Sequence, residues 1–98
     1  MSKVREYFKD HDETLDLFTS ALLKAHGKEH PEVFKVRDVY EDIQVKLEAN
    51  ETNYQQELQK LEMVTSNFKI PEGVCETFEK TYGMFKEAHK IARQGGNQ

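Results

Sequence analysis

Several kinds of residue are scarce in this chain of 98 residues, and each scarcity excludes a class of protein. There is one cysteine, Cys75, so no internal disulfide can form, and a single thiol suits a reducing compartment. No apolar run approaches the roughly 20 residues that a helix needs to span a bilayer. The first residues also lack the charged and then apolar pattern of a signal peptide. The sequence therefore predicts a cytoplasmic protein with no membrane partner.

The net charge and the small number of helix-breaking residues bear on the expected partner and on the expected fold. Fourteen Lys and Arg face eighteen Asp and Glu, which gives a net charge of −4 with no basic block, so nucleic acid is not an expected partner. Only five Gly and two Pro are present, and Glu, Lys, Gln and Leu are frequent, which favours helices. We expect an all-α fold with one small core.

Two interruptions divide the chain, one around residues 26–31 and one around residues 66–73. Gly27 suits a left-handed residue that ends a helix, Pro31 suits the first turn of the next helix, and Pro71 suits the start of a third. The expected helices lie within a single domain of residues 1–93, and a disordered tail covers residues 94–98. Their predicted bounds are about 3–26, 31–65 and 71–93.

The middle segment has no Gly or Pro between Pro31 and Thr65. Its apolar stripe keeps one phase at about 3.6 residues per turn. The stripe consists of Val36, Tyr40, Ile43, Leu47, Asn50, Tyr54, Leu58, Leu61 and Thr65. We therefore favour one long central helix of about 52 Å, from a rise of about 1.5 Å per residue.

A continuous middle helix would leave each half of the chain as a helical hairpin with an exposed apolar face. Two antiparallel copies could cover these faces by exchanging halves, which would build two four-helix bundles in a homodimer. The alternative is a monomeric three- or four-helix bundle with a break near residues 49–53, where Asn or Thr could cap a new helix.

Two stretches of the sequence carry a family resemblance. They are His26-Gly27-Lys28-Glu29-His30-Pro31-Glu32 and Thr65-Ser66-Asn67-Phe68-Lys69-Ile70-Pro71-Glu72-Gly73-Val74-Cys75-Glu76-Thr77-Phe78, and Val36-Arg37-Asp38-Val39-Tyr40 fits the same pattern. Together they resemble the hemerythrin-like domain of the repair-of-iron-centres family, loosely over residues 4–89. The resemblance implies a bacterial, cytosolic four-helix bundle linked to the repair of iron–sulphur clusters after nitrosative and oxidative stress.

The family's domain holds two irons through histidines and glutamates, but the matching positions here carry other residues. The first-helix histidine falls on Arg5, the third-helix histidine falls on Glu51, and the final His-x-x-x-Glu would begin near Gly95. The second-helix word His-Met-x-Lys-Glu-Glu has no counterpart. The resemblance thus implies a shortened scaffold without the di-iron ligands, in which a deletion fused two antiparallel helices into the long middle one.

Two histidines interrupt the apolar stripes of the outer segments. The first stripe consists of Val4, Phe8, His11, Leu15, Phe18, Leu22 and Ala25, and the last of Val74, Phe78, Tyr82, Phe85, His89 and Ala92. If the helices pack antiparallel, both histidines fall level with residue 48. We favour a polar layer formed by His11, Asn50, Glu51 and His89, which would set register and pairing and would need no cofactor. The alternative is a zinc or iron site with the ligands His11, Glu48, Glu51 and His89.

The remaining chemical groups point to no reaction. His26 and His30 are four residues apart, but Gly27 and Pro31 interrupt any helix through both. We expect His26 to interact with a helix dipole, His30 to act as a cap, and Cys75 to be a small packing residue.

No nucleophile–base–acid set or phosphate-binding loop is present, so we expect no enzyme. The predicted function is a non-catalytic binding or assembly protein that acts through dimerisation and a protein partner, with a metal-binding protein as the alternative.

Overall fold

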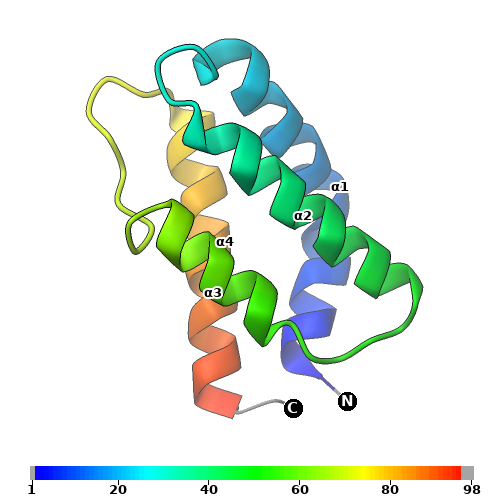
Figure 1. The fold of residues 1–98 in the computed structure, drawn as a ribbon. Coiled ribbons are helices and arrows are strands. Elements are labelled where there is room, and N and C mark those ends of the chain that lie inside the picture. Colours follow the sequence, from blue (N-terminus) through cyan, green and yellow to red (C-terminus); the bar gives the residue numbers. More distant parts are fainter. Residues whose placement is uncertain (1, 96–98) are drawn as a thin grey trace.

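The computed structural model describes residues 2–95, and within this range the chain forms four helices and no strand. The helices are α1 (Lys3–His26), α2 (Glu32–Glu48), α3 (Gln55–Val64) and α4 (Glu76–Gly95). In the fold, α1 packs against α2 and α4, and α3 packs against the same two helices. The α1–α2 connection and the start of α4 lie at one end of the bundle, and the start of α1 and the end of α4 lie at the other (Figure 1). The predicted all-α fold is confirmed.

The prediction of one central helix over residues 31–65 is wrong, because the chain turns after α2. Asn50 adopts a left-handed backbone with φ of 59°. The Asn50 N–H donates to the Leu47 carbonyl at 3.1 Å, and the Glu51 N–H donates to the Lys46 carbonyl at 3.0 Å. This hydrogen-bond pattern ends helices, and asparagine is one of the few residues other than glycine that tolerates its left-handed position. The four-helix alternative with a break near residues 49–53 is confirmed.

The common phase of the middle stripe has a different cause from helix continuity. Tyr40 and Ile43 of α2 and Leu58 and Leu61 of α3 are all buried in one core. Each helix therefore needs its own apolar stripe, and a turn of suitable length keeps the two in phase. The core is covered within one chain, so the exposed face that motivated an exchange of halves is absent from residues 2–95. The homodimer itself stays a prediction.

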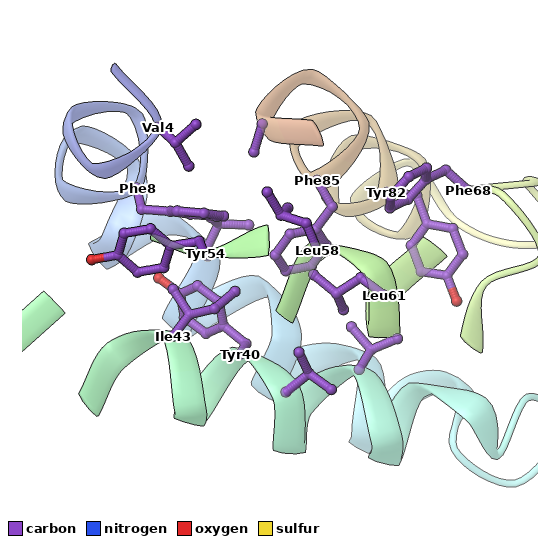
Figure 2. Close-up of a cluster of buried hydrophobic side chains, with 14 of the residues drawn as sticks. Val4, Phe8, Tyr40, Ile43, Tyr54, Leu58, Leu61, Phe68, Tyr82 and Phe85 are labelled. Atoms are coloured by element: carbon purple, nitrogen blue, oxygen red, sulfur yellow. The ribbon is translucent and has the colours of Figure 1, made fainter. Parts of the chain in front are cut away.

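Aromatic side chains fill the centre of the bundle (Figure 2). Three pairs of rings have centroids 4.6–5.9 Å apart; two of them join different parts of the chain, and the third lies within α4. They are Phe8–Tyr54, Tyr40–Phe85 and Phe78–Tyr82. Ring pairs at these distances add roughly 0.5–1.5 kcal/mol each beyond the area they bury. The tyrosines bring hydroxyl groups into this core, and each hydroxyl needs a partner.

The last helix begins five residues later than the predicted start at Pro71. A second turn of the same type ends α3, with the Ser66 N–H donating to the Met63 carbonyl at 3.3 Å and the Asn67 N–H donating to the Glu62 carbonyl at 2.7 Å. The left-handed backbone continues through residues 66–68. At its other end α4 includes Gln94 and Gly95, so the predicted disordered tail begins too early, and its residues 96–98 lie outside the described range.

Gly27 is required for a reason other than the predicted left-handed conformation. Its φ is −61°, within the right-handed helical region. A Cβ at this position would lie 2.5 Å from the Leu23 carbonyl oxygen and 2.7 Å from Cε2 of Phe34. Glycine therefore permits the close approach between the end of α1 and the start of α2.

Candidate functional site

The residues of the predicted polar layer are held by different partners. His11 Nδ1 lies 2.8 Å from the Tyr7 carbonyl of its own helix, and the His11 ring stacks on the Tyr7 ring at 4.1 Å. His89 Nε2 lies 3.6 Å from Glu62 Oε1, and its ring packs edge-on against Phe68. The two imidazoles thus each have a local contact that the helical periodicity did not indicate.

The two layer residues near the middle of the chain, Asn50 and Glu51, lie at the α2–α3 turn and are exposed, as is Glu48 of the alternative ligand set. Asn50 Oδ1 accepts a hydrogen bond from Arg5 Nη2 at 2.6 Å, and the Glu51 carbonyl accepts one from the Tyr54 hydroxyl at 2.7 Å. Glu48 is the last residue of α2. Within residues 2–95, no three His, Cys, Asp or Glu side chains gather where they could hold a metal ion. The structure therefore does not assemble the alternative ligand set His11, Glu48, Glu51 and His89.

Cys75 is exposed, so its interpretation as a packing residue is wrong. It directly precedes α4, and its carbonyl accepts from the Glu79 N–H at 3.2 Å. His26 Nε2 lies 3.2 Å from Cys75 Sγ. An imidazole at this distance can accept the proton of a thiol. The sequence could not indicate this contact, because the two residues are 49 positions apart.

The two histidines flanking the α1–α2 connection have unequal roles. His26 is the last residue of α1, the position at which the predicted interaction with the helix dipole would act, and that interaction stays a prediction. His30 does not act as the predicted cap, because α2 has no side-chain cap. Instead, His30 Nδ1 lies 3.5 Å from Glu32 Oε2. Both imidazoles also meet the edge or face of the Phe78 ring.

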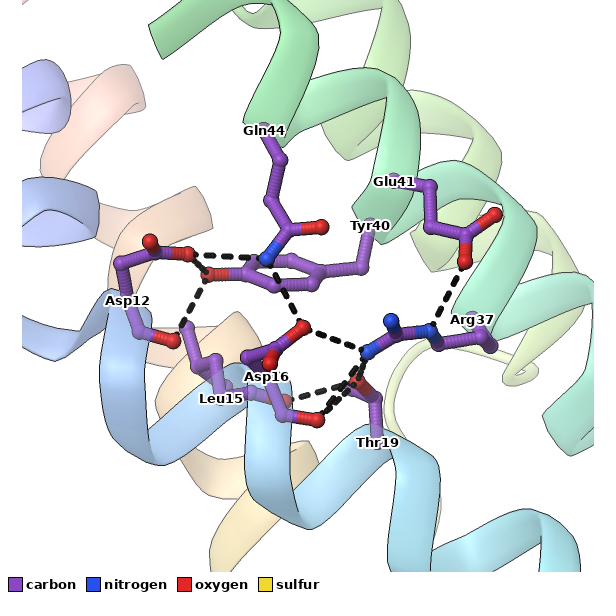
Figure 3. Close-up of polar contacts among 8 residues, drawn as sticks. All are labelled: Asp12, Leu15, Asp16, Thr19, Arg37, Tyr40, Glu41 and Gln44. Atoms are coloured by element: carbon purple, nitrogen blue, oxygen red, sulfur yellow. Dashed lines mark hydrogen bonds and ion pairs between the residues drawn. The ribbon is translucent and has the colours of Figure 1, made fainter. Parts of the chain in front are cut away.

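The seam between α1 and α2 holds a connected polar network (Figure 3). The Tyr40 hydroxyl donates to Asp12 Oδ1, and Gln44 Nε2 donates to Asp12 Oδ1 and Asp16 Oδ1 at 3.2 and 3.0 Å. Arg37 Nη1 donates to Asp16 Oδ1 at 3.0 Å. Hydrogen bonds from Gln44 and Arg37 lower the pKa of Asp16 below its usual range. Burial and the bond to Asp12 raise the pKa of Tyr40.

The three most buried tyrosines differ in how their hydroxyl groups are satisfied. Tyr40, Tyr54 and Tyr82 are at most 2% exposed. The first donates to Asp12, and the second donates to the Glu51 carbonyl at 2.7 Å. The Tyr82 hydroxyl is buried and has no hydrogen-bond partner among the described residues. Leaving such a group unpaired costs about 1–3 kcal/mol, so its presence calls for an explanation.

One other buried side-chain atom lacks a partner in residues 2–95, namely Arg5 Nε. The same guanidinium donates through Nη2 to Asn50, so the group is partly satisfied. The phenol of Tyr82 has one oxygen and no alternative atom to bond through. Burial, followed by the neighbouring Glu32 carboxylate, raises its pKa above the usual range.

Tyr82 lines a surface groove of about 620 Å³, which we call the Tyr82 groove. The groove lies between the start of α2, the end of α3 and the loop before α4. Its lining consists of Glu32, Val64, Thr65, Ser66, Lys69, Ile70, Pro71, Glu72 and Tyr82. In Figure 2 the Tyr82 hydroxyl turns away from Phe68 and out of the labelled core cluster. The groove thus combines apolar walls with a buried polar group that is free to bond.

Backbone strain lies beside this groove. Ser66, Asn67 and Phe68 have φ values of 54°, 65° and 61°, and Ser66 is part of the groove lining. A left-handed backbone costs roughly 1–2 kcal/mol at residues such as serine and phenylalanine, and less at glycine and asparagine. Strained backbone of this kind is concentrated at ligand clamps and active sites.

A second groove, of about 630 Å³, lies on the other side of the same turn. It is lined by Asn67 and Phe68 and by exposed charged residues of α4, including Lys86, Lys90 and Arg93. Neither of the two unpartnered buried atoms belongs to its lining. The Tyr82 groove is therefore the stronger candidate despite the similar volume.

Tyr82 lies at a position of the apolar stripe of the last segment, and this position does not indicate a binding role for its hydroxyl. An aromatic residue at a stripe position predicts burial, and Tyr82 is buried. Whether its hydroxyl finds a partner depends on the path of the loop at residues 65–75, which no local pattern specifies.

No helix within residues 2–95 is both long and apolar enough to cross a membrane. No protein-family model, curated protein or solved structure matches the chain.

Proposed function

We propose that this chain is a non-catalytic helical binding domain that holds a segment of another protein in the Tyr82 groove. In sequence it is similar to the hemerythrin-like domain of the repair-of-iron-centres family, without that family's di-iron ligands. The proposal keeps the protein-binding role expected from the sequence and locates it at the end of the bundle that carries the loop of residues 65–75.

The unpaired hydroxyl of Tyr82 is the observation that carries this proposal. A phenylalanine would fill the same space in the core without burying a polar atom. The hydroxyl therefore lowers the stability of the free chain by about 1 kcal/mol or more. A bound segment that offers a hydrogen-bond partner would recover this free energy only in the complex.

The shape of the groove supports a peptide segment as the occupant. Val64, Ile70 and Pro71 offer apolar contacts, and Thr65 and Ser66 supply nearby polar groups. Recognition grooves commonly combine apolar walls with a few polar groups that fix orientation. The turn at residues 66–68 beside the groove is strained, and strained backbone of this kind is concentrated at ligand-binding sites.

The dimer and the metal site expected from the sequence have less support. The break after α2 removes the geometric reason for exchanging halves, so the proposal does not depend on pairing of two copies. No contact among residues 2–95 favours the zinc or iron alternative.

Panning a displayed library of random peptides against the folded chain tests the proposal. Selected peptides should bind the wild type at least tenfold more tightly than Tyr82→Phe, a difference of about 1.4 kcal/mol. Tyr54→Phe is the matched control, because it removes a buried hydroxyl whose partner is internal, and it should bind like the wild type. Circular dichroism checks that both variants fold.

Failure to select any peptide would contradict the proposal. Equal affinity of the selected peptides for wild type and Tyr82→Phe would also contradict it, because the groove would then not be their binding place.

A further inference from the structure

We infer that the segment bound in the Tyr82 groove inserts a lysine or arginine side chain whose N–H groups reach the Tyr82 hydroxyl oxygen and the Glu32 carboxylate. This inference rests on the proposed function and adds the chemistry of the partner. It follows from the charges around the groove and from the position of Glu32.

The charged residues of the groove favour a cation. Two carboxylates, Glu32 and Glu72, and one ammonium group, Lys69, belong to its lining. The groove contains both the C-terminal end of α3 at Val64 and the N-terminal end of α2 at Glu32, so the opposite partial charges of these helix ends offset each other and the side-chain carboxylates set the preference. The net charge of −4 on the whole chain further favours approach of a basic segment.

Glu32 is held in position beside Tyr82. Its side chain is about one-third exposed, and Oε2 lies 3.5 Å from Nδ1 of His30. Glu32 is also the charged neighbour that acts on the Tyr82 phenol. A carboxylate and a phenol oxygen that share one groove form a natural pair of acceptors for a group with several N–H donors.

Lysine and arginine supply such donors and no acceptor. Their hydrocarbon stems can lie along apolar surface while the charged end reaches a polar group, and the groove offers Ile70, Pro71 and Val64 for the stem. An aspartate or glutamate would meet Glu32 and Glu72 as like charges. The phenol O–H of Tyr82 stays free to donate to a backbone carbonyl of the same segment.

Titration of the isotope-labelled full chain, followed by the NMR amide signals of Ile70 and Tyr82, tests this inference. The probes are tripeptides with blocked ends, Gly-Arg-Gly, Gly-Lys-Gly, Gly-Gln-Gly and Gly-Glu-Gly, together with putrescine as a free diamine. We expect the Arg and Lys peptides to shift both signals and the Gln and Glu peptides to leave them unchanged. Glu32→Gln should weaken Arg-peptide binding about tenfold, because charge-assisted hydrogen bonds are roughly twice as strong as neutral ones.

Glu13→Gln is the matched control, since it removes one carboxylate from α1 outside the groove, and it should leave the Arg-peptide affinity within about twofold of wild type. Equal shifts from all four tripeptides, or no shifts from any, would overturn the inference of a basic side chain. Tighter binding of putrescine than of either basic peptide would overturn it in favour of a small amine. None of these results contradicts peptide binding in the groove, which is tested separately by whether library peptides are selected and by their affinity for Tyr82→Phe.

Discussion

Tyr40 and Tyr82 are both buried aromatic residues in the same core, yet their hydroxyl groups have opposite surroundings. Tyr40 faces the α1–α2 seam, where Asp12 accepts a hydrogen bond from its hydroxyl and Gln44 and Arg37 extend the network to Asp16 (Figure 3). Tyr82 faces the groove beside the loop of residues 65–75, where none of the described residues pairs with its hydroxyl. The first site is complete within the chain, and the second is incomplete.

This difference separates a structural role from a binding role. A hydroxyl that is paired inside the fold contributes to stability, whereas an unpaired one lowers stability until something binds it. The strained turn at residues 66–68 adds a second unfavourable term at the same place. Stability and function thus make opposite demands on the hydroxyl groups of Tyr40 in α2 and Tyr82 in α4, and substitutions can measure each demand.

Alkaline pH should produce the largest effect and act on both sites. Burial raises the pKa values of Tyr40, Tyr54 and Tyr82, whereas the unfolded phenols ionise near 10.0. The stability that these groups contribute is present below pH 10 and is lost as pH rises above it. Each tyrosine should lower the unfolding free energy by about 1.4 kcal/mol per pH unit above 10.

Urea unfolding between pH 9 and 11, the range around the pKa of 10.0 of the unfolded phenols, measures this slope. Tyr40→Phe and Tyr82→Phe should each reduce this slope by about 1.4 kcal/mol per pH unit, which is the contribution of one ionising phenol. An unfolding free energy independent of pH in this range would contradict the burial of the phenols.

Tyr40→Phe should have the largest effect of the single substitutions. It removes a hydrogen bond to a charged acceptor, and such bonds contribute about 1.5–3 kcal/mol, so we expect a loss of about 2 kcal/mol at neutral pH. The urea midpoint at an unchanged m-value measures this loss. An unchanged midpoint would show that the α1–α2 network is not stabilising and would weaken the contrast with Tyr82.

Tyr54→Phe should have a smaller effect of the same sign. Its hydroxyl donates to the neutral Glu51 carbonyl, and removing this bond should cost about 1 kcal/mol. The same urea measurement applies. A loss equal to that of Tyr40→Phe would show that the charge of Asp12 adds nothing to the bond at Tyr40.

Ser66→Gly tests the strain in the groove wall and should have the smallest effect. Glycine adopts the left-handed backbone freely but loses more entropy on folding, so we expect a net gain of about 0.5 kcal/mol. Ser20→Gly in the interior of α1 is the matched control and should lose about 0.5–1 kcal/mol. A loss at both positions would show that Ser66 is not strained.

Helical periodicity predicted much of this fold, because a stripe of apolar residues reports which face of a helix is buried. It therefore identified the burial of Tyr40, Leu58 and Tyr82. It missed the turn at Asn50, because that turn depends on hydrogen bonds from the residues after the helix to the carbonyls of its last turn. The Asn-containing window was visible in the sequence, but its backbone conformation was not.

The candidate site was less predictable than the fold for a physical reason. His26 and Cys75 meet through tertiary packing across 49 positions, and the open bonding position of Tyr82 is created by the path of a loop. Neither feature has a local pattern in the sequence. The alternative ligand set of His11, Glu48, Glu51 and His89 does not assemble among residues 2–95, because its register assumed a continuous middle helix.

The unfolding free energy of Tyr82→Phe, measured beside Tyr54→Phe at neutral pH, tests the central claim most directly. Removing an unpaired buried hydroxyl should raise the stability of the free chain by about 1 kcal/mol, whereas Tyr54→Phe should lower it by a similar amount. A loss of stability in Tyr82→Phe comparable to that of Tyr54→Phe would show that the Tyr82 hydroxyl is already satisfied within the fold. That result would contradict a hydroxyl kept open for a partner.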